Sequence, residues 1–346
     1  MKLGVVLFNL GGPDRSDAVR PFLRNLFSDR AIIDLPGIVR YPLARFIADR
    51  RAPESREIFG QIGGRSPIVP ETEAQARAVE AKLAQAGHEV KAVIAMRYWH
   101  PFTQEAVAHM KMWNPDTIIL LPLYPQYSTT TSRSSLAEWH REAARQHLKI
   151  PTHEVCCFPV EEGFVAAMTN LVSDALQRTK PGVVYRILFS AHGLPKRVID
   201  RGDPYQWQVE QSVAAVVQRL NRSDVEHQIS FQSRVGRLEW IGPATDEEIR
   251  RAGAEGKGMI VVPVAFVCEH SETLFELDIK CARIASDSGV PDYIRVPTVR
   301  THPAFITGLA GLALASLAAR VPVSCVPGRL CPADSTCGQN VRQGHA

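Results

Sequence analysis

Two similar stretches decide the fold: ILFSAHGLP at residues 187–195 and VLFNLGGP at residues 6–13. Each is a short apolar run that ends in a turn with glycine and proline, as a buried strand does where it leaves a sheet. A second pair repeats this relation, with LLPLYPQYS at 120–128 and VVPVAFVCEHS at 261–271. The repetition predicts two similar halves that meet near residue 150. Chance similarity among hydrophobic strands is the alternative explanation.

Seven apolar runs are short and uniform enough to be strands buried on both faces of parallel sheets. They occupy residues 3–9, 89–96, 117–123, 185–190, 229–232, 259–266 and 292–296. Periodic segments such as 71–86 and 206–220 lie between them and predict helices. The alternation predicts an α/β fold in which each Rossmann-like half is a parallel sheet flanked by helices. Such folds bind ligands beyond the carboxyl ends of their strands.

Composition, charge and missing motifs argue against several classes of protein. The chain has 346 residues, 45% of them apolar, and a net charge of +4 from scattered basic residues. Its sequence contains no Lys/Arg run suited to a nucleic acid and no glycine motif for a dinucleotide or phosphate. The apolar start is too short for a signal peptide, and residues 304–319 fall short of the roughly 20 residues that span a bilayer. We therefore expect a cytoplasmic protein, at most peripheral on the inner face of the membrane.

A histidine and an acidic segment are the first candidates for chemistry. His192 directly follows an apolar run and precedes a glycine, which predicts an imidazole at the carboxyl edge of a sheet. Such an imidazole accepts protons or ligates a metal near neutral pH. Glu269, Glu272 and Glu276 recur at i, i+3 and i+7, so we expect one helix face with three carboxylates and Glu269 in its first turn. Clustered carboxylates relay protons or hold a divalent cation, whereas a satisfied strand-end histidine and a solvated acidic face are the alternatives.

Loops rich in aromatic and hydroxyl side chains follow other predicted strands. RYWHPF occupies residues 97–102, YPQYSTTTSRSS occupies 124–135, and Trp240 lies in FQSRVGRLEWIGP. Aromatic side chains in such loops suit a flat apolar ligand, with Arg97 or Arg133 for its carboxylates. Ordinary packing is the alternative.

In this order and spacing, these motifs resemble the ferrochelatase family. FSAHGLP, HSETLFELD, RYWHP, PLYPQYS and FQSRVG-x-x-x-W-x-GP all match, from about residue 3 to about residue 320. The resemblance implies a chelatase fold with a porphyrin between the halves, and insertion of ferrous iron into protoporphyrin IX as the last step of haem biosynthesis. His192 would accept pyrrole protons, Glu272 and Glu276 would be its acidic partner and proton relay, and His192 with Glu272 would ligate the Fe²⁺ substrate. The macrocycle would be lined by Leu10, Arg97, Tyr98, Tyr127, Ser128 and Trp240.

The cysteines are the main departure from the simplest family members. Cys325, Cys331 and Cys337 crowd the end of the chain at a spacing that fits no zinc finger. This tail resembles the subset of ferrochelatases with a [2Fe–2S] cluster, which implies these three ligands plus Cys157, with Cys156 as the other choice. Free thiols in the tail are the alternative.

The resemblance also bears on domains and partners. We expect an N-terminal half over residues 1–150, a C-terminal half over 151–302, and a helix with a cysteine-bearing tail over 303–346. Residues 35–51 mix apolar side chains with arginines, and the corresponding family region is an apolar lip, which implies peripheral membrane contact. A core helix with a basic face is the alternative. A cluster-bearing tail would also suit a homodimer.

Several other functions compete with this interpretation. Coproporphyrin III is the rival substrate, although LFSDRAIIDLP at 26–36 and the tail resemble protoporphyrin-dependent members. A cobalt or sirohydrochlorin chelatase would share the two-halved architecture but would need more basic loops for a more carboxylated substrate. A non-catalytic haem carrier would have no use for His192 opposite Glu272 and Glu276.

Overall fold

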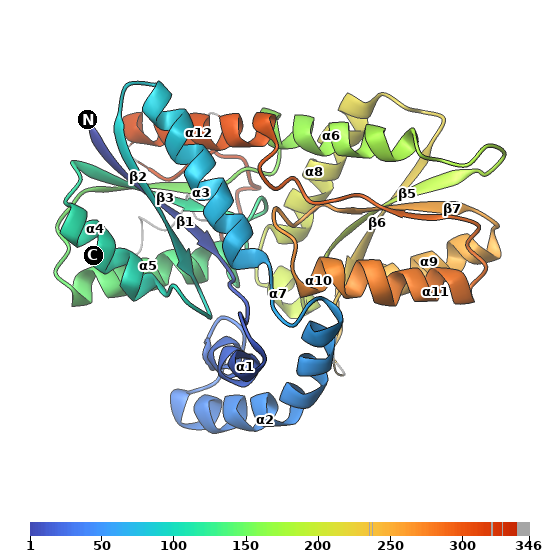
Figure 1. The fold of residues 1–346 in the computed structure, drawn as a ribbon, viewed down its shortest axis with the longest axis horizontal. Helices are drawn as coiled ribbons and strands as arrows, with labels where there is room; N and C mark the ends of the chain where they lie inside the picture. The colour runs from blue at the N-terminus through green and yellow to red at the C-terminus, as the bar shows by residue number, and fades with distance from the viewer. Residues whose placement is uncertain (235, 237, 320, 327, 338–346) are drawn as a thin grey trace.

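Two parallel β-sheets lie side by side, with helices on their faces (Figure 1). The structure is a computed structural model that describes residues 1–234, 236, 238–319, 321–326 and 328–337. The first sheet has the order β2-β1-β3-β4-β9 and the second β6-β5-β7-β8. The strands are β1 (Lys2–Asn9), β2 (Glu89–Met96), β3 (Thr117–Pro122), β4 (Thr152–Cys157), β5 (Tyr185–His192), β6 (Glu226–Gln232), β7 (Gly258–Pro263), β8 (Tyr293–Arg295) and β9 (Val323–Ser324).

The second sheet repeats the strand order of the first. β1 and β5 are central, β2 and β6 flank them on one side, and β3 and β7 flank them on the other. The strand pairs are parallel in both sheets. This arrangement confirms the predicted α/β fold of two similar halves. In the second sheet His192 pairs with Gln232, so β5 and β6 end at the same level and bring both residues to the carboxyl edge.

The sequence prediction lacks two strands of the first sheet, β4 and the two-residue β9. β4 was not predicted, because only its last three residues are buried and its first three carry the polar sequence THE. It pairs with β3, with Ile118 opposite Thr152, although it lies beyond the expected boundary at residue 150. The first sheet therefore extends to Cys157 and takes in β9 from the tail.

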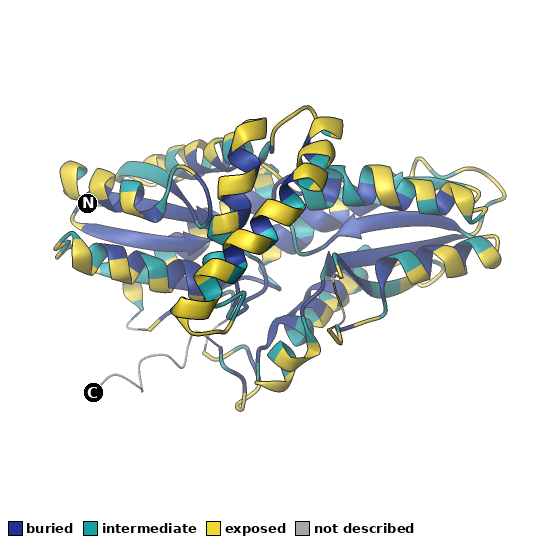
Figure 2. Cartoon of the chain, turned by 90° about the horizontal axis from the view of Figure 1, so that it is seen from below, coloured by how far each residue is buried: buried dark blue, intermediate teal, exposed yellow. Residues whose placement is uncertain are grey.

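Helices cover both faces of the sheets, so that the strands are buried and the outer helix faces are exposed (Figure 2). One hydrophobic cluster includes Leu7 and Ile119 of the first sheet together with Phe189 and Val262 of the second, so the halves share a core. The helices are α1 (Val19–Ser28), α2 (Gly37–Gln61), α3 (Ile68–Gln85), α4 (Thr103–Trp113), α5 (Ser132–Arg145), α6 (Glu162–Leu176), α7 (Lys196–Asp200), α8 (Tyr205–Leu220), α9 (Thr245–Ala254), α10 (Ser271–Leu274), α11 (Ala282–Asp287) and α12 (Pro303–Ala318), with a 3₁₀ turn at Ser16–Ala18 and a π-helical turn at Glu276–Cys281.

Three phenylalanines fix α6 and α12 over the junction of the halves. Phe158 follows β4, Phe164 lies in α6 and Phe305 lies in α12, and their ring centroids are 6.0 to 6.1 Å apart. Aromatic pairs at this spacing contribute about 0.5–1.5 kcal/mol each beyond the area they bury. The predicted helix at 304–319 therefore packs back on the body of the protein.

Helices α1 and α2 form a hairpin that projects from the sheets (Figure 1). Ala44, Ala48 and Ala52 recur at every fourth position of α2, and this small-residue face is buried. The opposite face leaves large apolar side chains exposed, including Ile38 at 86% and Phe46 at 64%. Among the described residues, none of the helices combines the length and apolar character needed to cross a membrane.

Candidate active site

A histidine and a glutamate from different elements of the second half form the core of the site. His192 is the last residue of β5, and Glu272 lies in the short helix α10 that follows β7. His192 Nδ1 lies 2.9 Å from Glu272 Oε2, and the two side chains are 36% and 25% exposed. Because the carboxylate engages Nδ1, Nε2 is the imidazole nitrogen left to accept a proton from a substrate.

A π-helical turn presents the second carboxylate. Such turns occur often at functional sites, and Glu276 is the first residue of this one. Its carboxylate accepts hydrogen bonds from Ser233 N at 2.9 Å, from the Ser233 hydroxyl, and from Gln232 Nε2 at 3.2 Å. The same Gln232 amide donates to Glu272 O at 2.7 Å. Gln232 thereby fixes the acidic row, Glu272 and Glu276, against the edge of the sheet.

Glu269 is not part of that row, which corrects the expectation of three carboxylates on one helix face. The helix begins at Ser271, with His270 as its N-cap, rather than at Glu269. Glu269 is fully buried, and its Oε1 lies 2.7 Å from Arg295 Nη1 and 3.0 Å from Thr298 N. A buried carboxylate needs such partners, so Glu269 anchors the segment that leads into the site.

The pairing of His192 with Glu272 shifts the pKa of both groups. Burial lowers the pKa of His192, but the charge and hydrogen bond of Glu272 outweigh burial and raise it above its ordinary value of 6.5. Burial raises the pKa of Glu272, but His192, supported by His270, outweighs burial and holds it well below its usual range. The substrate-free site therefore favours an imidazolium–carboxylate pair, and His192 becomes a proton acceptor only above its raised pKa.

Two side chains expected to line the macrocycle are tied to Asp29, in the loop after α1. Arg97 Nη2 lies 2.8 Å from Asp29 Oδ2, and the Tyr98 hydroxyl donates to the same oxygen at 2.8 Å. Ser134 Oγ accepts from Arg97 Nε at 2.8 Å. Tyr98 is 1% exposed and belongs to the core beneath α1 and α2. Its place in the lining of the macrocycle pocket stays a prediction. Arg97 is 18% exposed, and Asp29 neutralises its charge.

Tyr127 and Ser128 lie in the β3–α5 loop (residues 123–131) and are 1% and 0% exposed. Their place in the lining of the macrocycle pocket stays a prediction. Ser128 Oγ donates to Asp203 Oδ2 at 3.0 Å, and Thr129 N donates to the same oxygen at 2.7 Å. Because Asp203 belongs to the second half, its carboxylate fastens the loop of the first half to the second.

Trp240 and Leu10 lie beside the ends of the two central strands. Trp240 forms a β-bridge with Pro195, and a Cβ added to Gly193 would lie 3.4 Å from the indole ring, so Trp240 packs on the loop that follows His192. Leu10 follows β1 and packs, partly buried, against both the shared core and the α1–α2 cluster. The structure therefore brings Trp240 next to His192 and places Leu10 at the equivalent strand end of the first half.

Four buried cysteines gather on the first sheet next to Tyr127. This thiol group consists of Cys156, Cys157, Cys331 and Cys337. Cys156 Sγ lies 3.7 Å from Cys337 Sγ, and the neighbouring thiols, together with burial, raise the pKa of Cys157. The pairing of β4 with β9 shifts register between Val155 and Cys157, which breaks the alternation of side chains and lets adjacent cysteines face one cluster. Within the described parts of the chain, no three His, Cys, Asp or Glu side chains are already arranged as a metal site.

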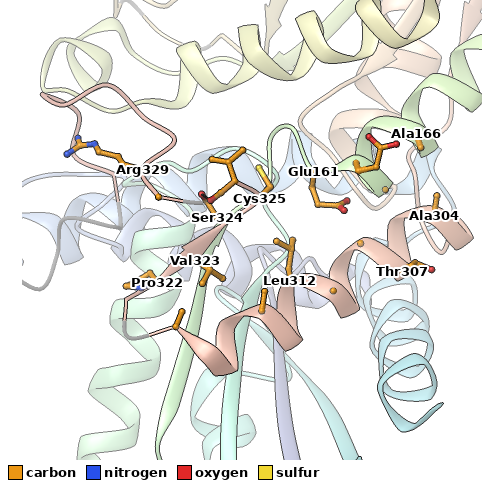
Figure 3. A pocket seen from close by; sticks show the side chains of 18 of the residues that line it. Glu161, Ala166, Ala304, Thr307, Leu312, Pro322, Val323, Ser324, Cys325 and Arg329 are labelled. Atoms are coloured by element: carbon orange, nitrogen blue, oxygen red, sulfur yellow. Dashed lines mark hydrogen bonds between the residues drawn. The ribbon is translucent and has the colours of Figure 1, made fainter. Parts of the chain in front are cut away.

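Cys325 lies apart from the thiol group. It packs, partly buried, against the shared core and lines a cavity of about 1140 Å³ between α12, the start of α6 and the tail (Figure 3). Glu161 and Leu312 line the same cavity, whereas His192 and Glu272 do not. The structure thus brings three of the four predicted cluster cysteines together and places Cys325 on another surface.

Four polar residues that hold this site were missed by sequence reasoning: the partly buried Asp29 and the buried Asp203, Gln208 and Gln232. Gln232 was the easiest to find, since it ends a predicted strand beside the one that ends in His192. Asp203 stands in RGDPY, where an acid before proline resembles a turn residue. Nothing in the local sequence distinguishes Gln208 from the exposed glutamines of α8.

Known structures define the class to which this fold and site belong. SirB from Bacillus subtilis, solved with Fe³⁺, matches 92% of this chain and 96% of its own with a TM-score of 0.53 at 13% identity. The sirohydrochlorin chelatase SirB from Bacillus subtilis subspecies spizizenii, in complex with cobalt, gives a TM-score of 0.52 at 13% identity. At such identity the likeness shows the fold alone, and that fold is the two-halved chelatase fold.

Sequence comparison narrows this class to one family. The ferrochelatase profile matches residues 2–317. The ferrochelatase of Phenylobacterium zucineum is 53% identical over 92% of this chain and 92% of its own, and that of Caulobacter vibrioides is 50% identical over 89% and 88%. The chain belongs to the ferrochelatase family. The reaction of this family is the insertion of iron into a porphyrin during haem synthesis, as the sequence motifs predict.

Proposed function

We propose that the chain inserts ferrous iron into protoporphyrin IX to form protohaem, with His192 as the acceptor of the pyrrole protons. The contact of 2.9 Å between His192 Nδ1 and Glu272 Oε2 carries this proposal. The carboxylate orients the imidazole so that Nε2 meets the substrate, and it stabilises the imidazolium once a proton has arrived. A haem carrier would need neither effect.

The acidic row provides a route for the protons to leave. Two pyrrole N–H bonds must break before the ring nitrogens bind Fe²⁺, and each proton passes to neutral His192. Glu272 then stabilises the imidazolium, and Glu276 stands next along the row toward Lys280, whose ammonium lies 3.6 Å from Glu276 Oε1 and is 52% exposed. Once deprotonated, His192 and Glu272 are an imidazole and a carboxylate, donors that Fe²⁺ accepts on its way to the porphyrin.

The choice of porphyrin is tested by parallel kinetics. Asp29 neutralises Arg97, which supports a substrate with two carboxylates over one with four. We expect kcat/KM for protoporphyrin IX to exceed that for coproporphyrin III by about tenfold or more, measured by anaerobic stopped-flow absorbance with Fe²⁺. A preference for coproporphyrin III would transfer the assignment to that substrate. Tight porphyrin binding without metal insertion would make the chain a carrier.

We propose in addition that the thiol group holds a [2Fe–2S] cluster. Four buried thiols suit such a cluster, which takes four thiolates. Two further observations support the fit: the buried Tyr127 hydroxyl beside these thiols has no hydrogen-bond partner among the residues that the structure describes, and the Gln208 amide donates to two of the sulfurs. We assign Cys157, Cys331 and Cys337 as ligands and Cys156, rather than Cys325, as the fourth, because Cys325 lies on the separate cavity. When bound, the cluster would cross-link β4 to the tail.

Anaerobically purified protein is therefore expected to contain about two iron and two sulfide atoms per chain and to absorb visible light. Cys156→Ser should lose the absorbance and the sulfide, because it removes one of the four thiolates. Cys325→Ser is the matched control and should retain both. The reverse pattern would restore Cys325 as the ligand, and colourless wild-type protein without sulfide would leave the thiols without a cluster.

We also propose that the exposed face of α2, within residues 35–51, contacts the membrane surface peripherally. Ile38, Pro42 and Phe46 recur at every fourth position on this face, and Arg45 is exposed beside them. An apolar stripe flanked by arginines suits an anionic headgroup layer. We therefore propose that the protein lies in the cytoplasm, peripheral on the inner face of the cell membrane.

Vesicle binding tests this contact. The double variant Ile38→Asp, Phe46→Asp should reduce co-sedimentation with phosphatidylglycerol vesicles by about tenfold, because burying either carboxylate in the interface is unfavourable. Met112→Asp, which replaces an apolar side chain 77% exposed on α4, should bind as the wild type does. Equal binding by all three proteins would rule out this face.

A homodimer is the last part of the proposal. The face of α12 that lines the cavity beside Cys325 carries Pro303, Thr307, Gly311 and Ala315, which are exposed and uncharged. Such a face supports close packing of a second copy. Sedimentation velocity at micromolar concentration is expected to give the dimer mass, and a monomer across that range would contradict it.

A further inference from the structure

The side chain of Gln208 joins the β3–α5 loop to the thiol group. Gln208 lies in α8 and is 0% exposed. Its Oε1 accepts a hydrogen bond from Tyr127 N at 2.7 Å, while its Nε2 donates to Cys331 Sγ at 2.9 Å and to Cys157 Sγ at 3.4 Å. One buried amide therefore spans a backbone group of the loop on one side and two sulfur atoms on the other.

The same helix holds that loop at neighbouring points. Asp203, just before α8, accepts from Ser128 Oγ and from Thr129. Further along the helix, Ser212 Oγ accepts from Gln126 Nε2 at 2.8 Å. Hydrogen bonds to Asp203, Gln208 and Ser212 thus hold the loop along α8. Of these three residues, Gln208 is the one whose side chain also donates to cysteine sulfurs.

The first residue of α8 lies beside the catalytic pair. Burial chiefly raises the pKa of Tyr205, the nearby charge of Glu272 raises it further, and the backbone N–H of His192 opposes the rise. The phenol therefore lies close to both His192 and Glu272, three residues before Gln208 on the same helix. A displacement of Gln208 is therefore transmitted to Tyr205, beside the catalytic pair, through less than one turn of α8.

We propose that Gln208 is a positioning residue, which couples the state of the thiol group to the β3–α5 loop and to the start of α8 beside His192. A neutral thiol is a weak acceptor, whereas a metal-bound thiolate carries negative charge and strengthens the N–H···S hydrogen bond. Metal binding at the thiols then fixes the amide, and the fixed amide oxygen holds Tyr127 N more firmly. The inference builds on the proposed role of His192, but the coupling itself concerns Gln208, Tyr127 and the thiols.

A double-mutant cycle read by hydrogen–deuterium exchange tests the coupling without any need for metal insertion. Cys331→Ser should speed amide exchange in the β3–α5 loop by about fivefold, the effect of losing one hydrogen bond of ordinary net strength. Gln208→Glu keeps the acceptor for Tyr127 N but removes the donor to sulfur. In that background Cys331→Ser should change the exchange by less than about twofold, because the link is already broken.

Kinetics supply a readout that simple loss of stability would not produce. Gln208→Glu is expected to lower kcat for iron insertion by about fivefold with KM for porphyrin unchanged, because the coupling bears on His192 rather than on affinity. Gln208→Met serves if the glutamate variant does not fold. Gln206→Glu, on the less buried face of the same helix, is the matched control and should leave kcat and exchange at wild-type values.

Additive effects in the cycle, or no response to Cys331→Ser in the wild-type background, would overturn the coupling. A rise in KM without a fall in kcat would do the same. A chain that shows the exchange coupling but inserts no metal would instead defeat the proposed function and leave the coupling standing.

Discussion

Replacement of His192 by alanine is expected to slow iron insertion by about a thousandfold and to leave porphyrin affinity nearly unchanged. The imidazole is the proton acceptor placed at the end of β5. Glu272 contacts Nδ1, on the other side of the ring from Nε2, so its carboxylate is not placed to take over the role of that nitrogen. The backbone of residue 192 still pairs with Gln232 in the variant, so the sheet edge and the pocket walls persist.

The two quantities are measured separately. Porphyrin affinity comes from fluorescence quenching in the absence of metal, and the insertion rate comes from anaerobic stopped-flow absorbance. His109→Ala is the matched control, since this exposed histidine of α4 lies in the other half of the molecule. Near-normal insertion by the His192 variant would remove this residue from the mechanism, and a parallel loss of affinity would make it a binding residue.

The sequence predicts the architecture well because burial on both faces leaves a strong local signal. β1, β3, β5 and β7 are apolar runs, and their alternation with amphipathic helices leaves few topologies open. β4 escapes this reasoning, since half of it is polar and only its pairing with β3 makes it a strand. The loose sequence repeat also predicts which strands of the two halves correspond. Its first pair of segments contains β1 and β5, which occupy equivalent places in their sheets.

The catalytic pair is predictable for a similar reason, whereas its surroundings are not. His192 ends the buried strand β5, and Glu272 lies in the helix that comes after the buried strand β7, so the parallel sheet carries both to one edge. The helix register of the acidic segment depends on His270 as the N-cap and on the π-helical turn, which periodicity alone does not reveal. A strict 3.6-residue repeat therefore predicts that Glu269 lies on the same helix face as the acidic row. In the structure its carboxylate pairs with Arg295 instead.

Loop residues show where local reasoning ends. Tyr98 and Tyr127 follow predicted strands, as pocket residues do, but the direction of each ring is set by partners far away in the chain. Asp29 binds the Tyr98 hydroxyl across 69 positions, and Gln208 binds Tyr127 N across 81. The spacing of the tail cysteines likewise gives no hint that Cys325 separates from Cys331 and Cys337, because that depends on where β9 pairs.

Glu272→Gln is expected to move the pH dependence of iron insertion to lower pH and to reduce the maximal rate. In the wild type, insertion needs neutral His192, so the rate falls as the pH drops through a midpoint above 6.5. The variant loses the charge that raises this pKa but keeps the burial that lowers it. Its midpoint should therefore lie below that of the wild type.

The maximal rate falls for a different reason. At high pH both proteins hold a neutral imidazole, but the variant has no carboxylate to stabilise the imidazolium or to pass its proton on, and we expect a loss of about a hundredfold. The difference between the two proteins should shrink as the pH falls through the wild-type midpoint, because the wild type loses its proton acceptor there before the variant does.

Glu276→Gln is the graded control for this experiment. Glu276 also raises the pKa of His192, but it contributes less than Glu272, and its own carboxylate is bonded to Ser233. Its variant should shift the midpoint in the same direction by a smaller amount. The measurement is kcat against pH between 5.5 and 9 at saturating porphyrin and Fe²⁺. An unmoved midpoint in Glu272→Gln, even with a large loss of rate, would show that the titrating base is a group other than His192.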